Sequence, residues 1–271
     1  LSLENGVVKN VHYGDILVKF GEILDVKKEL LPMIVDELVL AKYRDSFLQN
    51  GDIVIADTAE DETVGKCSEI AGVSDEKIIA GLHTIPCRPL FNFASGYLGY
   101  YLNSDDYHRQ LLPLMQGIKV TSISKSALQD TIIQYPKSLE EQVQIGTYFR
   151  WLDHLITLHQ RRYKRLKLFK ESMLNKMFPK DSEKIPEIRF EGFSNDWKQH
   201  KLGKIASKIT MKNTGSQYIE TFTNSAEFGI ISQRDFFDHN VSNIENIEGY
   251  YVVEDDVFVY NPRISTSAPV G

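Results

Sequence analysis

One long uninterrupted stretch near the middle of the chain most restricts what it can fold into. Residues 138–178 contain no proline and a single glycine. The stretch opens with a Ser-x-x-Glu capping box, in which Ser138 is the N-cap and Glu141 follows three residues later. Acidic residues occupy the first turn, as the helix dipole prefers, and Pro179 cannot continue a helix. The sequence therefore predicts one long helix over residues 138–179.

Apolar side chains recur along this helix at alternating intervals of four and three residues. The positions of this seam are Ile145, Phe149, Leu152, Ile156, Tyr163, Leu166, Met173 and Met177. Two polar residues, His159 and Lys170, interrupt it. The spacing is that of an a/d heptad repeat, and at 1.5 Å per residue the helix would be roughly 60 Å long. Such a seam predicts packing against a partner helix, as in a coiled coil.

The charge of the chain is unevenly distributed. The net charge is −6, which by itself argues against a nucleic-acid-binding protein. The long helix nevertheless carries a basic block, which consists of Arg161, Arg162, Lys164, Arg165, Lys167 and Lys170. Such a block can face solvent, contact phosphates or dock on an acidic surface of another protein. We favour docking or solvent over direct contact with DNA.

Composition places the chain among folded intracellular proteins. With 271 residues, 42% of them hydrophobic and 25% charged, it can form two domains. No apolar run approaches the roughly 20 residues that span a bilayer. Cys67 and Cys87 could pair, but nothing else indicates secretion, so we expect reduced cysteines and a cytoplasmic protein without membrane contact.

The residues before the helix have the pattern of mixed α and β structure. Two runs bounded by Gly-Asp, residues 13–20 and 50–57, predict strands. Residues 95–115 predict one or two short helices, residues 116–128 a Ser/Thr-rich loop, and residues 130–136 another strand. These predictions indicate a mixed domain in front of the helix.

The residues after the helix begin a second mixed segment. Residues 180–197 are polar and predict a linker. Residues 47–58 and 251–262 share an aromatic residue, a turn that ends in aspartate, an apolar strand and a polar loop. This partial repeat favours two related mixed domains joined by a helical rod.

The order of motifs around the helix resembles the conserved spacer of the specificity subunit of type I restriction–modification enzymes. That family has a proline, a Glu-Gln pair, an I…L…LD…I pattern and a lysine-rich helix. These fall here on Pro136, Glu141, Gln142, Ile145, Leu152, Asp153, Ile156 and the stretch after Arg161. Residues 185–210 resemble the beginning of the family's second target-recognition domain. Residues 224–237 and 257–271 resemble parts of such a domain, so the resemblance covers essentially the whole chain.

The resemblance implies an α+β architecture in three parts. They are a mixed α/β target-recognition domain over residues 1–137, a coiled-coil-forming spacer helix over residues 138–179, and a linker with the start of a second target-recognition domain over residues 180–271. The family's usual opening segment is absent before Leu1, and a second spacer would lie beyond Gly271. We therefore expect a fragment of a longer protein.

The resemblance also implies a function. Subunits of this family hold two target-recognition domains apart, so that each reads one half of a split sequence in double-stranded DNA. The subunit is not catalytic, and methylation subunits and motor-nuclease subunits join it. S-adenosylmethionine, ATP and Mg²⁺ are expected on those partners and no cofactor on this chain. The seam would be met by a second copy, a missing C-terminal helix or partner helices.

The sequence contains only weak matches to catalytic and metal-binding motifs. Residues 260–263, "YNPR", resemble the Asn-Pro-Pro-aromatic motif of adenine methyltransferases, but Arg263 stands where the second proline belongs, and no glycine-rich loop precedes it. His154 and His159 lie five residues apart, which is the wrong interval for one helical face, and no cysteine or carboxylate completes a zinc set. A self-contained methyltransferase is disfavoured. A coiled-coil scaffold without DNA specificity remains the alternative function.

Candidate DNA contacts are polar side chains on expected loops and strand ends, because base edges take hydrogen bonds from such groups. In the first domain they are Lys66, Arg88, Lys119, Thr121 and Ser122, and in the second domain Gln233, Arg234, Asn261, Arg263, Ser265 and Thr266. Lys66 and Arg88 could instead pair with nearby acids, and Arg234 with Asp235 or Asp238. Target-recognition domains vary across the family, so the resemblance transfers no base contact.

Overall fold

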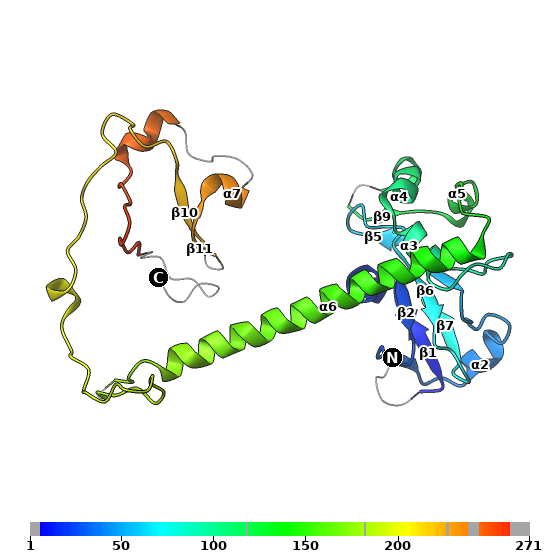
Figure 1. Cartoon of the computed structure of the whole chain (residues 1–271). Helices are drawn as coiled ribbons and strands as arrows, with labels where there is room; N and C mark the ends of the chain where they lie inside the picture. The colour runs from blue at the N-terminus through cyan, green and yellow to red at the C-terminus, as the bar shows by residue number, and fades with distance from the viewer. Residues whose placement is uncertain (1–5, 118, 182, 226–227, 238–243, 261–271) are drawn as a thin grey trace. The chain divides into compact units, whose positions relative to one another are not determined.

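The computed structural model describes residues 6–117, 119–181, 183–225, 228–237 and 244–260. Its contacts divide the chain into two compact units, Leu1–Met173 and Leu174–Gly271. The helix α6 (Leu139–Lys176) begins in the first unit and ends in the second (Figure 1). Because the division falls inside this helix, the units are described separately.

The first unit is built on short strands in three small sheets. Its elements before α6 are β1 (Val8–Val11), α1 (Tyr13–Val18), β2 (Ile23–Asp25), β3 (Met33–Ile34), α2 (Leu38–Lys42), β4 (Ile53–Ala56), β5 (Thr58–Ala59), β6 (Cys67–Ala71), β7 (Ile78–Ala80), β8 (Thr84–Cys87), α3 (Tyr97–Leu102), α4 (Asp105–Leu111), η1 (Leu112–Leu114), β9 (Thr121–Ser122) and α5 (Lys125–Gln129). The sheets have the strand orders β3-β1-β7, β2-β6-β4-β8 and β5-β9. The pairs β1–β7 and β2–β6 are parallel, and the others are antiparallel.

The strand β4 separates two hydrophobic clusters. Its four residues are all buried, and successive side chains of a strand point to opposite faces of the sheet. Ile53 and Ile55 join one cluster with residues of α3 and α4, whereas Val54 and Ala56 join the other with Ile16 of α1 and residues of β1 and β7. The apolar run predicted as a strand is therefore covered on both faces, and this part of the prediction is confirmed.

The strand predicted over residues 13–20 is wrong, because the structure forms the helix α1 there. Ile16 and Phe20 are buried, four residues apart, while Val18 is 87% exposed. A strand would have turned all three side chains to the same face. The Nδ1 atom of His12 accepts a hydrogen bond from the amide of Gly14 and caps the first turn. Burial at a helical interval therefore decided the local structure.

The strand predicted over residues 130–136 is also wrong, because this segment pairs with no strand. Side chains from α3 and α4 bind its backbone instead. The side-chain amide of Gln110 bonds both the N–H and the carbonyl of Ile132, at 3.0 Å each, and the amide of Gln134 donates to the Tyr101 hydroxyl. Within the loop predicted over residues 116–128, the structure forms β9 and α5.

The helix α6 confirms the predicted spacer helix and its N-cap. The amide of Glu141 donates to the Ser138 hydroxyl at 3.4 Å, and the helix continues for 38 residues to Lys176, ahead of Pro179. The α+β class and the spacer helix are confirmed. Cys67 is buried and Cys87 exposed, and the two form no disulfide in the described structure. Their reduced state stays a prediction. Among the described residues, no helix is both long and apolar enough to cross a membrane.

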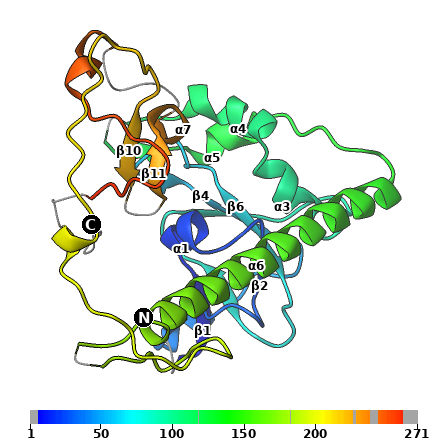
Figure 2. The same ribbon diagram turned by 60° about the vertical axis from the view of Figure 1, so that its left-hand side comes forward.

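The second unit is smaller and has less regular structure. Its elements after α6 are η2 (Leu202–Lys204), β10 (Phe222–Ser225), β11 (Gly229–Ser232), α7 (Gln233–Phe237) and η3 (Ile244–Gly249). The strands β10 and β11 form an antiparallel pair beside α7 (Figure 2). The strand predicted within residues 251–262 is wrong for its described part, because residues 251–260 contain only an isolated bridge between Tyr251 and Lys212.

Candidate nucleic-acid interface

Two predicted DNA contacts, Thr121 and Ser122, lie on β9 and pair with β5. Thr58 is opposite Ser122, and Ala59 is opposite Thr121. Ser122 also exchanges backbone hydrogen bonds of 2.9 and 2.8 Å with Gln116, which closes a tight loop that carries the exposed side chain of Lys119. The two hydroxyls thus lie on a paired strand end, and the lysine lies two residues before it.

Polar residues from three other segments join this strand end. Asp57 precedes β5, and its amide donates to the carbonyl of His83 in the turn between β7 and β8. The hydroxyl of Thr58 donates to the Asp57 carboxylate at 2.8 Å, and the ring of Tyr13 meets the ring of His83 edge-on. The sequence analysis missed this cluster. Its only local signal was Asp57, a polar residue directly after the apolar strand β4.

The predicted contact Lys66 is half-buried and bonded inside the first unit. Its ammonium donates to the carbonyl of Leu17 at 2.9 Å. A shallow pocket beside it is also lined by the carboxylates of Glu22, Asp61 and Glu62. Because these acids repel phosphate, this position suits a structural lysine better than a DNA contact.

The predicted contact Arg88 pairs with a buried acid. Its Nε and Nη2 atoms donate to the two carboxylate oxygens of Asp52 at 2.8 and 2.7 Å, and Nη2 also donates to the carbonyl of Phe47. The Asp52 side chain is only 4% exposed, so Arg88 supplies its counter-charge. The planar guanidinium is therefore used largely to hold the β4 region together.

The second unit contains two described candidates. Gln233 begins α7, where its amide donates to the carbonyl of Thr221 and its side-chain oxygen accepts from the Thr221 hydroxyl. Arg234 is exposed on the same helix. The other candidates, Asn261, Arg263, Ser265 and Thr266, lie outside the described residues. This candidate set therefore stays a prediction.

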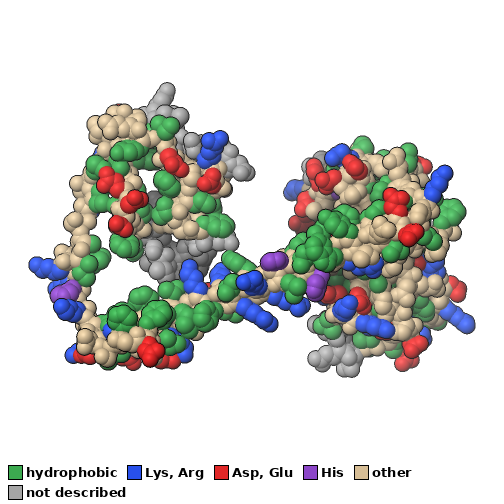
Figure 3. Space-filling model, in the orientation of Figure 1, with side chains coloured by type: hydrophobic (Ala, Val, Ile, Leu, Met, Phe, Trp, Pro, Cys, Tyr) green, Lys and Arg blue, Asp and Glu red, His purple; other side chains and the backbone are tan. Residues whose placement is uncertain are grey.

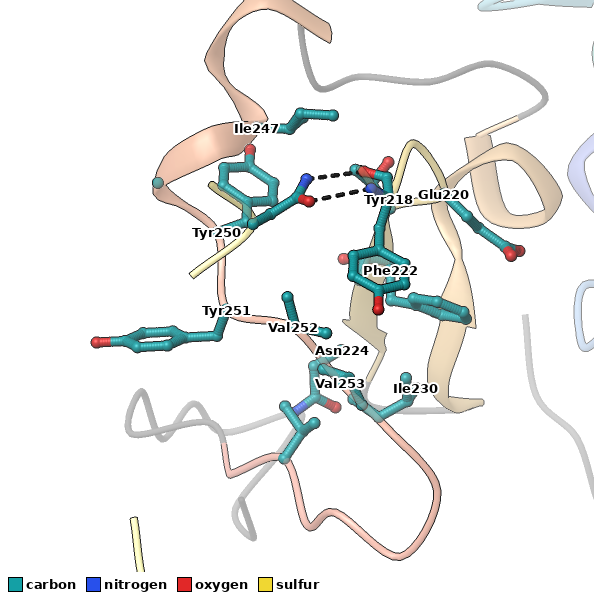
Figure 4. Close-up of a pocket in the computed structure, with 15 residues that line it drawn as sticks. Tyr218, Glu220, Phe222, Asn224, Ile230, Ile247, Tyr250, Tyr251, Val252 and Val253 are labelled. Atoms are coloured by element: carbon teal, nitrogen blue, oxygen red, sulfur yellow. Dashed lines mark hydrogen bonds between the residues drawn. The ribbon is translucent and has the colours of Figure 1, made fainter. Parts of the chain in front are cut away.

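The second unit also has a pocket of about 620 Å³ that the sequence analysis missed (Figure 4). Its described lining is mostly aromatic and apolar, with Tyr218, Phe222 and Tyr250 among its residues. The side-chain amide of Asn213 bonds both backbone groups of Tyr218, at 2.7 and 3.0 Å, and so fixes one wall. Among the described lining residues, Glu220 is the one charged side chain, which disfavours phosphate as an occupant.

The first turns of α6 pack against the rest of the first unit. Gln142 is buried, with its oxygen accepting from the amide of Ala94 at 3.0 Å and its nitrogen donating to the carbonyl of Pro136. A Cβ on Gly146 would lie 3.3 Å from the carbonyl oxygen of Ser95, so the helix backbone approaches this loop closely. In Figures 1 and 2 this part of α6 runs beside α3.

A buried carboxylate supports the loop on which α6 docks. Glu69 of β6 is 3% exposed and accepts hydrogen bonds from the amides of Gly96 and Gly99, at 2.5 and 3.1 Å. Burial raises the pKa of the Glu69 carboxyl, although these amides and the positive charge of Arg150 on α6 act in the opposite direction. The carboxylate thus links a central strand to the start of α3 and to the spacer helix.

The predicted helix seam divides into a docked part and an exposed part. Ile145 packs partly against the core of the first unit, and Phe149 stacks on Tyr100 of α3. Farther along, Ile156, Tyr163 and Leu166 are 54%, 58% and 56% exposed. The remaining seam residues, Leu152, Met173 and Met177, are half-buried. The exposed part is the stretch that a partner helix could cover.

The basic block of α6 is exposed along the middle of the helix. Its members Arg161, Arg162, Lys164, Arg165, Lys167 and Lys170 all face solvent, and blue side chains mark this stretch in Figure 3. Among the described residues, none of the six forms an ion pair with an acid. The block thus keeps its charge available for an anionic partner.

A comparison with protein families matches residues 15–168 to the type I restriction modification DNA specificity domain. The match covers more than half of the chain. The chain belongs to this family. A search of curated proteins finds no match. The family assignment confirms the resemblance that was based on the order of motifs from Pro136 onward.

Membership in the specificity-domain family establishes the general role of the chain. A specificity domain recognises DNA sequence in type I restriction–modification systems, and it is a recognition module rather than a catalytic one. The match begins within α1, includes the strands from β2 to β9, and covers most of α6, up to Leu168. It does not extend to the second unit, so the identity of that unit as a second recognition domain stays a prediction.

Proposed function

We propose that this chain is the DNA-recognition subunit of a type I restriction–modification complex and that it reads one half of a split target with its first unit. The observation that carries this proposal is the specificity domain that continues into the unbroken helix α6. A spacer of this kind has a purpose where two recognition elements must be held at a set distance on DNA. The second unit would read the other half.

The length of α6 would set the separation of the half-sites. At 1.5 Å per residue, 38 residues span roughly 57 Å. The segment of α6 from Gln142 to Asp153 would set the direction of the spacer helix relative to the rest of the first unit. Its polar contacts and the close approach of its backbone would hold the helix in one orientation. Half-site spacing would then depend on helix length, and half-site sequence on the recognition domain.

Partner subunits would supply the chemistry of the complex. Methylation subunits would dock on the spacer helix, where the basic block of α6 offers a surface for acidic side chains. S-adenosylmethionine would bind to these subunits, and ATP and Mg²⁺ to the motor-nuclease subunits. Partner subunits would also contribute phosphate contacts, which resolves the conflict between the net charge of −6 and DNA binding.

Co-purification with methylation mapping tests this function. The chain, within its full-length parent if that is longer, would be expressed with the methylation subunit encoded beside it, and methylated sites would be mapped by single-molecule sequencing. We expect a stable complex that methylates adenine in both halves of a split sequence. Absence of both complex and methylation would overturn the proposal and favour a coiled-coil scaffold without DNA specificity.

A change in helix length tests the role of α6 separately. Insertion or deletion of one heptad near Tyr163 keeps the seam in register and changes the length by roughly 10 Å. We expect an altered spacing between unchanged half-site sequences. Unchanged spacing with altered half-site bases would contradict a spacer role for the helix. Insertion of seven residues between β3 and α2, where residues 35–37 are exposed, is the matched control, and it should leave the spacing unchanged.

A further inference from the structure

The turn between β7 and β8 presents two residues that are unfavourable for folding. Leu82 at its tip is 83% exposed, which leaves a large apolar side chain in water. His83 beside it adopts a left-handed conformation with φ of 56°, where glycine is preferred. Neither choice improves stability, because a polar residue and a glycine would fit these positions better. The left-handed backbone of His83 points to a function of the tip, and Leu82 is the exposed apolar side chain next to it.

The backbone of this turn is held by contacts on both sides. The Thr84 hydroxyl donates to the carbonyl of Gly81 at 2.6 Å, and the amide of Gly81 donates to the carbonyl of Val11. A Cβ on Gly81 would lie 2.8 Å from Oδ1 of Asn10, so the turn is also held against β1. These contacts, with the bond from the amide of Asp57 to the carbonyl of His83, anchor the turn that carries Leu82 and His83.

The imidazole of His83 is oriented while it remains accessible. Its side chain is 58% exposed, and the Tyr13 ring meets it edge-on with centroids 5.4 Å apart. Nδ1 lies 3.4 Å from both Oδ1 of Asp57 and Oγ1 of Thr58. Since the Thr58 hydroxyl already donates to Asp57, both oxygens favour hydrogen on Nδ1. In the neutral ring, this tautomer leaves Nε2 as an acceptor.

We propose that Leu82 and His83 form a base-reading tip of the first unit. His83 accepts a hydrogen bond through Nε2 from the exocyclic amine of adenine or cytosine, and Leu82 packs against the edge of a neighbouring base. The Asp57 carboxylate repels phosphate, which favours base amines over the DNA backbone. Thr121 and Ser122 lie on the adjoining β9 strand and extend the same surface. This inference rests on the proposed function and assigns it specific residues.

The variant His83→Gly separates recognition from folding. Glycine adopts the left-handed conformation without strain, so the melting temperature should stay the same or rise. In the complex with the methylation subunit, we expect discrimination at one base pair of one half-site to fall on the order of tenfold, as loss of one base contact predicts. The other half-site and the spacing should not change.

The variant Leu82→Ser tests the apolar contact, and Leu90→Ser is its matched control. Leu90 is 92% exposed on a different loop of the same unit. We expect Leu82→Ser to weaken the base preference at the position next to the one read by His83. Leu90→Ser should leave the methylated sequence motif unchanged. All variants would be mapped by methylation sequencing of the full complex.

The experiments distinguish failure of the base-reading tip from failure of the proposed function. A wild-type complex with a split motif, together with unchanged motifs for both His83→Gly and Leu82→Ser, overturns the base-reading tip and leaves the function standing. A lower melting temperature of His83→Gly with an unchanged motif identifies His83 as a structural residue and also overturns the inference. A wild-type complex without any motif overturns the proposed function and this inference with it.

Discussion

The hydroxyl of Tyr100 on α3 donates a 2.6 Å hydrogen bond to the carboxylate of Asp153 on α6. The same tyrosine ring stacks on Phe149, with centroids 5.2 Å apart. Burial, followed by the contact with Asp153, raises the pKa of Tyr100 above its ordinary value. One side chain thus joins the recognition unit to the spacer helix by an apolar and a polar contact, which lie one helical turn apart on α6.

Tyr100→Phe should remove the polar contact and keep the stacking. We expect a loss of about 1 kcal/mol in the free energy of unfolding, the usual net value of one hydrogen bond. Urea unfolding would measure it. Tyr148→Phe is the control, since that tyrosine is 57% exposed on α6 and its loss of a hydroxyl should change stability by less than about 0.5 kcal/mol. Equal effects of the two variants would contradict a specific role of the Tyr100–Asp153 bond.

Gly99→Ala should destabilise the first unit, although alanine is the better helix former. A Cβ at Gly99 would collide with the backbone carbonyl oxygen of Glu22 and lie 3.1 Å from the Cβ of Glu69. We expect a cost of about 1–3 kcal/mol, against a gain of about 1 kcal/mol in an open helix. Gly21→Ala is the control, because a Cβ there has no neighbour within 4 Å. A stable Gly99→Ala variant in urea would refute the close approach.

Arg88→Ala should leave the buried carboxylate of Asp52 without its counter-charge. We expect a loss of about 2 kcal/mol, below the 3–5 kcal/mol of fully buried pairs, because half of the Arg88 side chain reaches solvent. In a double-mutant cycle with Asp52→Ala, the combined loss should be smaller than the sum of the single losses. Additive losses would show that the two residues act independently and would restore Arg88 as a free candidate for DNA contact.

Leu166→Asp should weaken self-association through α6 without unfolding the chain. The side chain is 56% exposed, so the substitution has little effect on the folded chain alone, but it would place a carboxylate inside a helix seam. We expect the dissociation constant measured by sedimentation to rise at least tenfold. Leu168→Asp is the matched control, because Leu168 is similarly exposed but lies off the heptad positions. Identical masses for wild type and Leu166→Asp would refute the seam.

Glu76→Gln should remove a part of the stability that depends on pH. Hydrogen bonds from the amides of Ser74 and of Glu76 itself, with the nearby charge of Lys9, lower the pKa of Glu76 to about 2 from 4.5. Because the folded-state pKa is depressed, the carboxylate stabilises the fold above pH 4.5, and this contribution is lost as the pH falls towards 2. The stability difference between wild type and variant should therefore shrink between these values in urea unfolding. A difference independent of pH would contradict the assignment.

Features that depend on neighbouring residues in the chain could be predicted. The cap at Ser138, the heptad spacing and Pro179 lie on one segment, and together they define a helix by local hydrogen bonding and propensity. The buried strand β4 was readable for the same reason, as a short apolar run after a Gly-Asp turn. The order of motifs along the spacer was sufficient for the family resemblance.

Features that depend on residues far apart in the sequence could not be predicted. Residues 13–20 have the composition of a strand, but contact with the core buries Ile16 and Phe20 and makes the segment helical. Residues 130–136 have strand composition as well, but Gln110 and Tyr101 bind their backbone in place of a neighbouring strand. Arg88 was a candidate DNA contact with pairing to a nearby acid as the alternative, and only the fold revealed that it pairs with the buried Asp52.

The sequence by itself determined the spacer helix, its seam and the family, because these reside in short-range periodicity and in motif order. The tertiary structure alone decided which polar groups meet. Tyr13, Asp57, Thr58 and His83 are separated by up to 70 residues. They come together because the turn that carries His83 joins β7, which pairs with β1 just before Tyr13, to β8, which pairs with β4 just before Asp57. Long-range packing sets such contacts, since the free energy of burying the core selects the chain path and the surface clusters follow from it.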